Sequence, residues 1–212
     1  MKDKIIDFIK KNRVSSTEVA DCLGKTGAVK NIRALNRGKF SVGNIFWAYA
    51  HEGSNWDVHE QIQNVSDDDI VFVDCFNCGD KAIFGDLVSK YLLLYKGALA
   101  IVVNGNLRDV NRLIKENWPI WCINVNPEGC VNSKPLHALD ESVVLEYKTK
   151  YDGAIAVCDD TGVVVIPKYH HNQEFLDRLI FIEEQEDTWY ECIDKHKYST
   201  FETVCLKKYE LK

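Results

Sequence analysis

The spacing of hydrophobic and polar positions changes several times along the chain, and each spacing predicts a type of element. In the amino-terminal segment, apolar side chains recur at helical intervals. Ser15 or Ser16 can cap a second helix there, and Gly24 can end it. From residue 40 onward, short runs rich in β-branched residues alternate with helical patterns. Helices are expected at residues 4–11, 17–23, 55–64, 85–96, 107–117 and 172–195, and strands at residues 40–49, 70–75, 98–103, 120–125, 143–148, 154–157 and 163–166.

The order of these elements predicts an α/β fold. Strands and helices alternate up to residue 125, and three strands then follow one another before the last helix. Turns are expected at residues 151–153 and 159–162, where Asp, Thr and Gly gather. Because no low-complexity or linker-like segment interrupts the pattern, residues 1–212 are expected to form one domain with a mixed sheet and helices on its faces.

The composition is that of a globular protein, and it narrows the possible partners. Of the 212 residues, 46% are hydrophobic and 27% are charged, and the formal net charge is -6 at pH 7. An acidic chain is poorly suited to binding phosphate backbones, so no nucleic-acid partner is expected. Apolar runs fall short of the ~20 residues that cross a bilayer, and the amino terminus lacks a secretory pattern. We therefore expect no membrane partner and a cytoplasmic location.

The cysteines include one motif with possible chemistry. Cys75 and Cys78 form a Cys-x-x-Cys pair, which is typical of zinc or redox sites. Cys122 and Cys130 have the wrong separation for a second zinc knuckle, and the pair does not begin a helix as in thioredoxin-like proteins. The favoured interpretation is two loop thiols near a site entrance. Five further cysteines lie in apolar patterns and are expected to be reduced core residues: Cys22, Cys122, Cys158, Cys192 and Cys205.

Two segments combine chemically useful residues, one at the start of a predicted helix and one after a predicted strand. Residues 85–88 open a helix, and the first backbone N–H groups of a helix have no internal partner, so they form a site for an anion. The next strand is followed by Arg108 and Asp109, at the edge where ligands of α/β sheets collect. An anion site, an arginine and a single carboxylate suit a carboxylate substrate together with a hard divalent cation.

These residues also carry a resemblance to a known family. The sequence resembles the RraA-like family, which includes class II aldolases of 4-hydroxy-4-methyl-2-oxoglutarate and the regulator of ribonuclease E activity. The resemblance implies a layered α-β-β-α sandwich with mixed sheets, of the swivelling β/β/α type, and a homotrimer or hexamer. Its core would cover residues 15–190, with residues 172–212 at a subunit interface. The segments that carry the resemblance are residues 19–24, 71–74, 84–87, 104–109 and 159–167, together with Asn55, His59, Gly97 and Pro119.

The resemblance further implies how a small 2-keto acid would be bound. Backbone amides of the loop at residues 85–88 would hold its carboxylate. Arg108 would stabilise the enolate oxygen, because a fixed cation is effective where negative charge develops. Asp86 would hold the water that exchanges a proton with the substrate. The substrate-binding residues implied in this way are Gly85, Asp86, Leu87, Val88 and Arg108.

The same resemblance implies a metal and a contribution from a second subunit. Asp109 would be the direct protein ligand to Mg²⁺ or Mn²⁺. A glutamate from the neighbouring subunit's last helix would assist Asp86 in proton transfer. Glu183, Glu184 and Glu186 compete for this catalytic role, and Glu186 is our choice.

Two features depart from the family pattern. Arg112 stands where the family has an acid, three positions after the metal-binding aspartate, and the spacing from Gly85 to Arg108 is one residue longer than in the aldolases. The implied function is a divalent-metal-dependent lyase that acts on 2-keto acids through an enolate, as aldolase or oxaloacetate decarboxylase. Two alternatives remain open: a non-catalytic regulator that binds a ribonuclease or another protein, and a specialised pathway enzyme with an unusual 2-keto or sugar-derived substrate.

Overall fold

A mixed β-sheet forms the centre of the molecule. The computed structural model describes residues 1–211, and within them the sheet has eight strands. The strands are β1 (Arg33–Ala34), β2 (Ser41–His51), β3 (Asp69–Phe76), β4 (Ala82–Phe84), β5 (Ala100–Leu107), β6 (Ile120–Val125), β7 (Ile155–Cys158) and β8 (Val163–Ile166). They follow the order β1-β6-β5-β3-β2-β7-β8, and β4 pairs with β5. The pairs among β2 to β6 are parallel, whereas β1, β7 and β8 run antiparallel to their neighbours.

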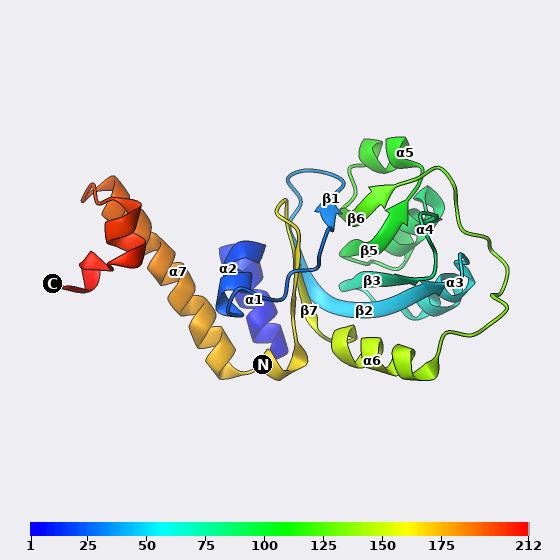
Figure 1. The fold of residues 1–212 in the computed structure, drawn as a ribbon, viewed down its shortest axis with the longest axis horizontal. Coiled ribbons are helices and arrows are strands. Elements are labelled where there is room, and N and C mark those ends of the chain that lie inside the picture. Colours follow the sequence, from blue (N-terminus) through cyan, green and yellow to red (C-terminus); the bar gives the residue numbers. More distant parts are fainter. Residues whose placement is uncertain (212) are drawn as a thin grey trace.

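Helices lie on both sides of the folded sheet, as Figure 1 shows. The α-helices are α1 (Lys2–Asn12), α2 (Ser16–Cys22), α3 (Trp56–Gln61), α4 (Asp86–Lys90), α5 (Val110–Lys115), α6 (Glu141–Tyr151) and α7 (Gln173–Asp194). Shorter helical turns are η1 (Ile62–Asn64), η2 (Tyr91–Tyr95), η3 (Lys168–His170), η4 (Phe201–Cys205) and η5 (Lys208–Leu211). Within residues 1–211, no helix is long and apolar enough to cross a membrane.

The sheet folds over itself, because β2 belongs to both of its halves. Residues 44–51 of β2 pair with β3, and residues 41–44 pair with β7, which crosses the end of β2 (Figure 1). One core lies between the halves, where Phe72 and Trp121 face Ala156 and Val165. The two β layers are therefore parts of one continuous sheet.

Two further hydrophobic cores attach the helices to the outer faces. Val58, Val88 and Leu113 fix α3, α4 and α5 to the half that contains β3 and β5. On the other half, α1, α2 and α7 bury apolar side chains against β7 and β8. The order is helices, sheet, sheet, helices, which confirms the predicted α/β fold with α-β-β-α layers.

Local sequence signals explain where several helices begin and end. Ser15 caps α2, because its hydroxyl accepts from the Glu18 N–H while the Glu18 carboxylate accepts from the Ser15 N–H. Asn172 caps α7 through the Phe175 N–H. Gly97 follows η2 at a φ of 71°, and a Cβ there would lie 2.3 Å from Oδ1 of Asp67. The predicted helix at residues 85–96 is thus confirmed as α4 and η2.

The strand predicted at residues 143–148 is wrong, because these residues lie in α6. Asp140 caps this helix by accepting from the Ser142 N–H. Val144, Tyr147 and Tyr151 recur at helical intervals and pack on the core between the sheet halves. The β-branched run at its start suggested a strand, but the cap and this spacing favour a helix.

The cysteine predictions are mostly confirmed. Within residues 1–211 all eight cysteines are free thiols, and Cys22, Cys122, Cys158 and Cys192 are buried as expected. Cys205 is exposed instead, because η4 lies at the end of the chain beyond the sheet cores. Cys75 is in β3 and not in a loop, whereas Cys78 lies in the connection from β3 to β4.

Candidate functional site

Parallel pairing brings the two predicted site segments together. In β4 and β5, Phe84 lies opposite Leu107, so the residues that follow these strands emerge side by side. The Arg108 N–H donates to the Phe84 carbonyl at 3.1 Å. Gly85 and Asp109, far apart in sequence, therefore meet at the carboxyl edge of the sheet, where ligands of α/β sheets collect.

Gly85 permits a close approach between its loop and Asp109. A Cβ at Gly85 would lie 2.0 Å from Oδ2 of Asp109, which no larger residue can satisfy without displacing the carboxylate. The Asp86 N–H donates to the same oxygen at 3.4 Å. Asp109 has a φ of 57°, a left-handed conformation that aspartate tolerates better than most residues. The backbone of both segments is thus shaped to hold this one carboxylate.

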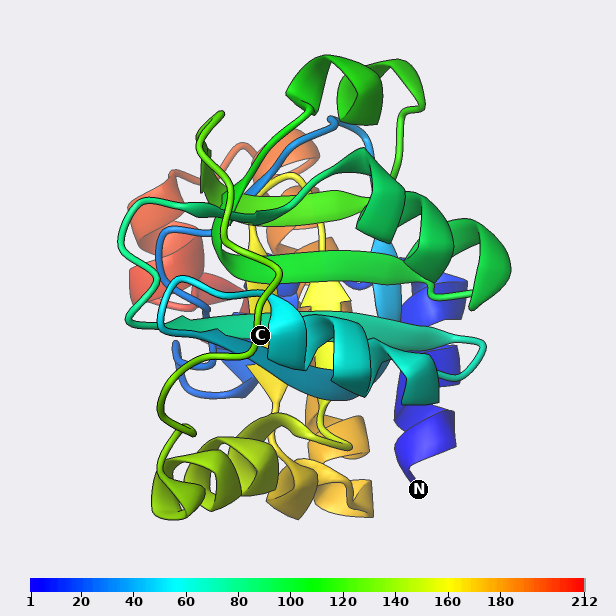
Figure 2. The same ribbon diagram turned by 90° about the vertical axis from the view of Figure 1, so that its right-hand side faces the viewer.

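Arg108 lies beside the same carboxylate and rests on a second loop. Its Nε is 3.7 Å from Oδ2 of Asp109. A Cβ at Gly129 would lie 2.4 Å from Nη1 of Arg108, so the connection after β6 provides a flat backbone surface against the guanidinium. Figure 2 shows this connection, residues 126–140, crossing that side of the molecule. Both ionic side chains remain nearly half exposed, at 46% for Arg108 and 44% for Asp109.

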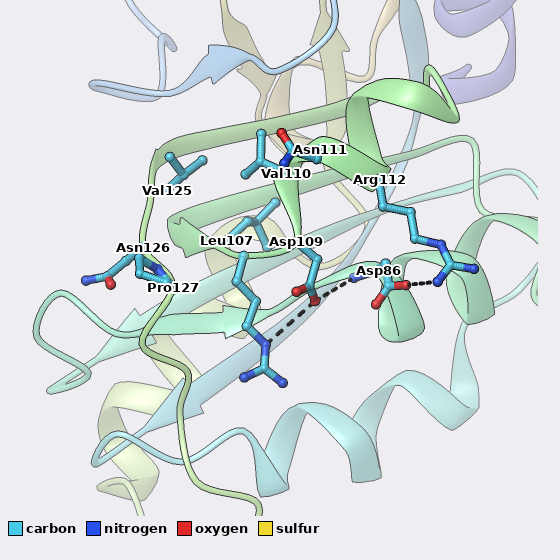
Figure 3. Close-up of a pocket in the computed structure, with 10 residues that line it drawn as sticks. Asp86, Leu107, Asp109, Val110, Asn111, Arg112, Val125, Asn126 and Pro127 are labelled. Carbon is cyan, nitrogen blue, oxygen red and sulfur yellow. Dashed lines mark hydrogen bonds and ion pairs between the residues drawn. The ribbon is translucent and has the colours of Figure 1, made fainter.

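Arg112 forms an ion pair with Asp86. Its Nη1 lies 2.9 Å from Oδ2 of Asp86, and Figure 3 shows the two side chains pointing toward one another. Arg112 is one helical turn after Asp109 in α5, so its side chain extends toward the start of α4. An exposed pair of this kind contributes at most about 1 kcal/mol to stability. Its main consequence is that one oxygen of Asp86 is already engaged.

These charged residues line one cavity of about 540 Å³. This volume is suited to a small ligand. Figure 3 shows Asp86 and Asp109 on one side of it and the connection after β6 on another. The lining residues are Asp86, Leu107, Arg108, Asp109, Val110, Asn111, Arg112, Val125, Asn126 and Pro127. The structure thus brings Asp86, Arg108 and Asp109 together, as the sequence predicted.

The other residues of the predicted substrate loop contribute backbone only. Leu87 is 76% exposed and Val88 is buried beneath α4, so neither side chain lines the cavity. Their amides lie in the first turn of α4, where helical N–H groups have no partner within the helix. This arrangement is compatible with a role that depends on the main chain.

The glutamates of α7 lie away from this cavity within the chain. Figure 1 shows α7 at the opposite end of the molecule from α4 and α5. Partial burial raises the pKa of Glu183 and of Glu186, and the nearby carboxylate of Glu18 raises both further. Only a second subunit could bring Glu183, Glu184 or Glu186 to the cavity, so the role of Glu186 stays a prediction.

The donor set around Asp109 fits a hard divalent ion held by few protein ligands. No cluster of three or more His, Cys, Asp or Glu side chains suited to a metal occurs in the described part of the chain. Mg²⁺, however, usually takes one or two carboxylates and fills its other positions with water and substrate oxygens. The half-exposed carboxylate of Asp109 in an open cavity meets that requirement.

Sequence reasoning missed the contribution of the connection after β6. Asn106 and Asn126 each donate to the Asp80 carbonyl at 2.7 Å, which joins the end of β5 and the connection after β6 to the connection between β3 and β4. The Ala82 N–H donates to the Glu128 carbonyl at 2.7 Å, which places Gly129 against Arg108. Gly129 was the available signal, because a glycine after a strand often allows a close approach.

Comparisons with known proteins identify relatives of the chain. The chain is 24% identical over 199 residues to protein DlpA of Legionella pneumophila, covering 88% of this chain and 31% of that protein. It therefore spans about a third of the length of this curated relative. It is 31% identical over 173 residues to a Halalkalibacterium halodurans protein with the provisional name 4-hydroxy-4-methyl-2-oxoglutarate aldolase, covering 79% of this chain and 80% of that one.

A solved structure and a family model complete the comparison. The fold matches Streptomyces coelicolor RraAS2, described as an unusual member of the RNase ES inhibitor RraA protein family, with a TM-score of 0.69 and 24% identity. The match covers 87% of this chain and 96% of that one. The family model RraA-like (Aldolase/RraA) matches residues 16–165, which include the whole cavity and exclude α7. The chain therefore belongs to the RraA-like family.

Proposed function

We propose that the protein is a divalent-metal-dependent lyase that cleaves small 2-keto acids through an enolate, as aldolase or oxaloacetate decarboxylase. The observation that carries the proposal is the meeting of Arg108, Asp109 and the Gly85 loop at one cavity. The Halalkalibacterium relative, named for an aldolase, supports it. RraA regulators belong to the same family, so family membership does not distinguish an enzyme from a regulator. We favour the enzyme because of the residues that line the cavity.

Arg108 and the Gly85 loop would orient the substrate. The backbone N–H groups at the start of α4 would donate to its carboxylate, and the guanidinium would lie next to its 2-keto oxygen, where negative charge develops as the carbon–carbon bond breaks. Gly129 keeps the guanidinium close to Asp109. Loss of one such donor typically costs about 3 kcal/mol of transition-state stabilisation.

Asp109 would hold Mg²⁺ or Mn²⁺ through its carboxylate. When bound, the ion acts as a Lewis acid that polarises the 2-keto group. Gly85 and the Asp86 N–H fix this carboxylate in place. Asp86 would use the oxygen that Arg112 leaves free to hold the water that transfers a proton to or from the substrate methyl group.

A second subunit would complete the site. We propose a homotrimer or hexamer in which α7 of one subunit brings Glu186 to the cavity of the next. The outer surface of α7 and the segment after it carry exposed apolar side chains, including Phe181, Tyr190 and Phe201, which is typical of a contact surface. Residues 172–212 would thus serve as an interface element of a single domain.

The proposal is tested by pyruvate release from oxaloacetate and from 4-hydroxy-4-methyl-2-oxoglutarate, with and without added Mg²⁺. Arg108→Ala and Asp109→Ala should each lose at least about 100-fold in kcat/KM. Arg37→Ala and Asp7→Ala, which alter exposed residues outside the cavity, should retain the wild-type rate. Equal rates in wild type, Arg108→Ala and Asp109→Ala would overturn the proposal.

The Arg112–Asp86 ion pair favours a second candidate, a regulator that acts by binding a ribonuclease or another protein. It places a cation where the aldolases have an acid, and it engages the proposed proton-transfer residue. Pulldown of a ribonuclease by wild type and by Asp109→Ala to the same extent, without metal-dependent pyruvate release, would favour this candidate. A screen over other 2-keto acids and sugar-derived substrates distinguishes such a regulator, which should convert none of them, from a specialised pathway enzyme, which should convert one.

A further inference from the structure

Three cysteines gather beside the loops that border the cavity, and they do not pair as their spacing suggests. The sulfur of Cys75 lies against β5, where a Cβ at Gly105 would be 2.5 Å from it. Cys78 instead shares a side-chain hydrogen bond with Cys130, which lies 52 positions later in the connection after β6. The Cys-x-x-Cys motif is therefore divided between two environments.

Most groups around Cys78 favour its thiolate, whereas the Phe76 carbonyl, to which the Cys78 thiol donates at 3.5 Å, favours the protonated form. The Gly53 N–H donates to its sulfur, and Lys81 lies close by, with Nζ 3.4 Å from where a Cβ of Gly53 would be. The hydrogen bond from Cys130, together with these groups, outweighs burial and lowers the pKa of Cys78 to about 7. A thiolate at neutral pH is the reactive form of cysteine.

The other two thiols remain protonated. Burial raises the pKa of Cys75 well above its ordinary value. The pKa of Cys130 is raised chiefly because its thiol donates to Cys78. Of the three thiols, Cys78 is thus the one that ionises most readily, and Cys130 is the one that interacts with it.

The pair also joins two segments that border the cavity. The Cys130 N–H donates to the Ala82 carbonyl at 2.8 Å, and the preceding residue, Gly129, supports the guanidinium of Arg108. Cys78 precedes β4, which leads directly into Gly85. A covalent bond between the two sulfurs would tie the connection after β6 to the start of β4.

We propose that Cys78 reacts with a small hydroperoxide and forms a disulfide with Cys130 that fixes the loop supporting Arg108. The Cys78 sulfur attacks one peroxide oxygen, so that an S–O bond forms, the O–O bond breaks and hydroxide leaves. The Cys130 sulfur then attacks the sulfenic sulfur, so that the S–S bond forms and water leaves. Two thiols and one hydrogen peroxide thus give one disulfide and two waters. Cys78 is 5% exposed and Cys130 9% exposed, which admits a small oxidant better than a bulky disulfide.

The test treats the full chain with one equivalent of hydrogen peroxide and maps thiols by mass spectrometry under non-reducing conditions. Wild type and Cys205→Ser, which lacks the exposed thiol, should both yield a Cys78–Cys130 crosslinked peptide that a dithiol reductant removes. Cys130→Ser should trap a sulfenic acid at Cys78, detected as a dimedone adduct. Cys78→Ser should leave Cys130 unmodified. Hydrogen exchange should slow at the amides of Ala82 and Cys130 after oxidation of the wild type.

These readouts do not depend on the lyase activity, so the two proposals can fail separately. Oxidation confined to Cys205, or a Cys75–Cys78 disulfide in place of the crosslink, would overturn this proposal. So would a wild-type protein in which Cys78 and Cys130 stay reduced. The wild-type map decides the matter even if a serine variant fails to fold.

Discussion

Arg112 Nη1 lies 2.9 Å from Asp86 Oδ2 at the edge of the cavity that Arg108 and Asp109 share. This pair places a positive charge one helical turn from the carboxylate proposed to hold the metal ion. Repulsion between the guanidinium and a divalent cation is expected to weaken metal binding. We therefore expect this ion pair to set how tightly the site binds a metal ion.

Replacement of Arg112 by an acid should strengthen metal binding. Arg112→Asp removes the cation and adds a carboxylate that can hold a metal-bound water, and such outer ligands are worth ~10 to 100-fold in affinity. The measurement is Mn²⁺ binding by isothermal titration calorimetry. Arg112→Ala removes the ion pair without adding an acid, and it should fall between the wild type and Arg112→Asp. Equal Mn²⁺ affinity in all three proteins would contradict this expectation.

Gly85 and Gly129 form a matched pair with different predicted effects. In Gly85→Ala, the new Cβ would displace the Asp109 carboxylate, so Mn²⁺ affinity should fall at least about 10-fold. In Gly129→Ala, the new Cβ would displace the Arg108 guanidinium, so Mn²⁺ affinity should persist while kcat/KM falls about 100-fold. Calorimetry and steady-state kinetics on both variants check this. Identical defects in the two variants would show that the two contacts are not separable.

Asp74 should make stability depend on pH. Burial raises its pKa, although hydrogen bonds from Asn104 and Trp47, both 2.8 Å long, oppose the effect. The folded state therefore holds this proton to higher pH than the unfolded state does. Its contribution is present below the unfolded pKa of 3.8 and is lost as pH rises through the raised folded pKa.

Asp74→Asn isolates that contribution, because asparagine does not titrate. The free energy of unfolding of the wild type minus that of Asp74→Asn should fall as pH rises above 3.8. Urea unfolding at a series of pH values measures it. A difference that grows with pH would mean that the hydrogen bonds outweigh burial.

Mixed oligomers should reveal whether the site is shared between subunits. If Glu186 acts in a neighbour's cavity, Arg108→Ala and Glu186→Gln are inactive alone, and co-refolding them should restore about a quarter of the wild-type activity. Co-refolded Arg108→Ala and Asp109→Ala supply the control, because both changes affect the same half of the site and should not rescue each other. No rescue in the first mixture would show that Glu186 does not act in the cavity of a neighbouring subunit.

The site could be predicted from sequence where it depends on the edges of parallel strands. Arg108 follows a predicted strand, β5, whereas Gly85 follows β4, a strand of 3 residues that the apolar pattern did not predict. Parallel pairing of β4 with β5 brings the two residues together. The proximity of Gly129 to Arg108 depends on how residues 126–140 cross the sheet edge, and no periodic pattern encodes that path.

The fold was predictable to a similar degree. Regular apolar spacing located most strands of the central sheet and the long α7, but it missed the short strands β1 and β4. At residues 143–148 the β-branched run suggested a strand. The structure has a helix there, because Asp140 caps it and Tyr147 and Tyr151 pack on the core at helical spacing. The partner of Cys78 was hidden for another reason, because Cys130 is distant in sequence and only the folded chain brings it near.

Crystals soaked with Mn²⁺ and oxalate, a mimic of the pyruvate enolate, would show whether this cavity binds a 2-keto acid and a divalent ion through Arg108 and Asp109. We predict an anomalous Mn²⁺ peak in direct contact with the Asp109 carboxylate. We also predict oxalate between the guanidinium of Arg108 and the amides that follow Gly85. Mn²⁺ and oxalate bound elsewhere, or a cavity left empty at saturating concentrations of both, would contradict the proposed function.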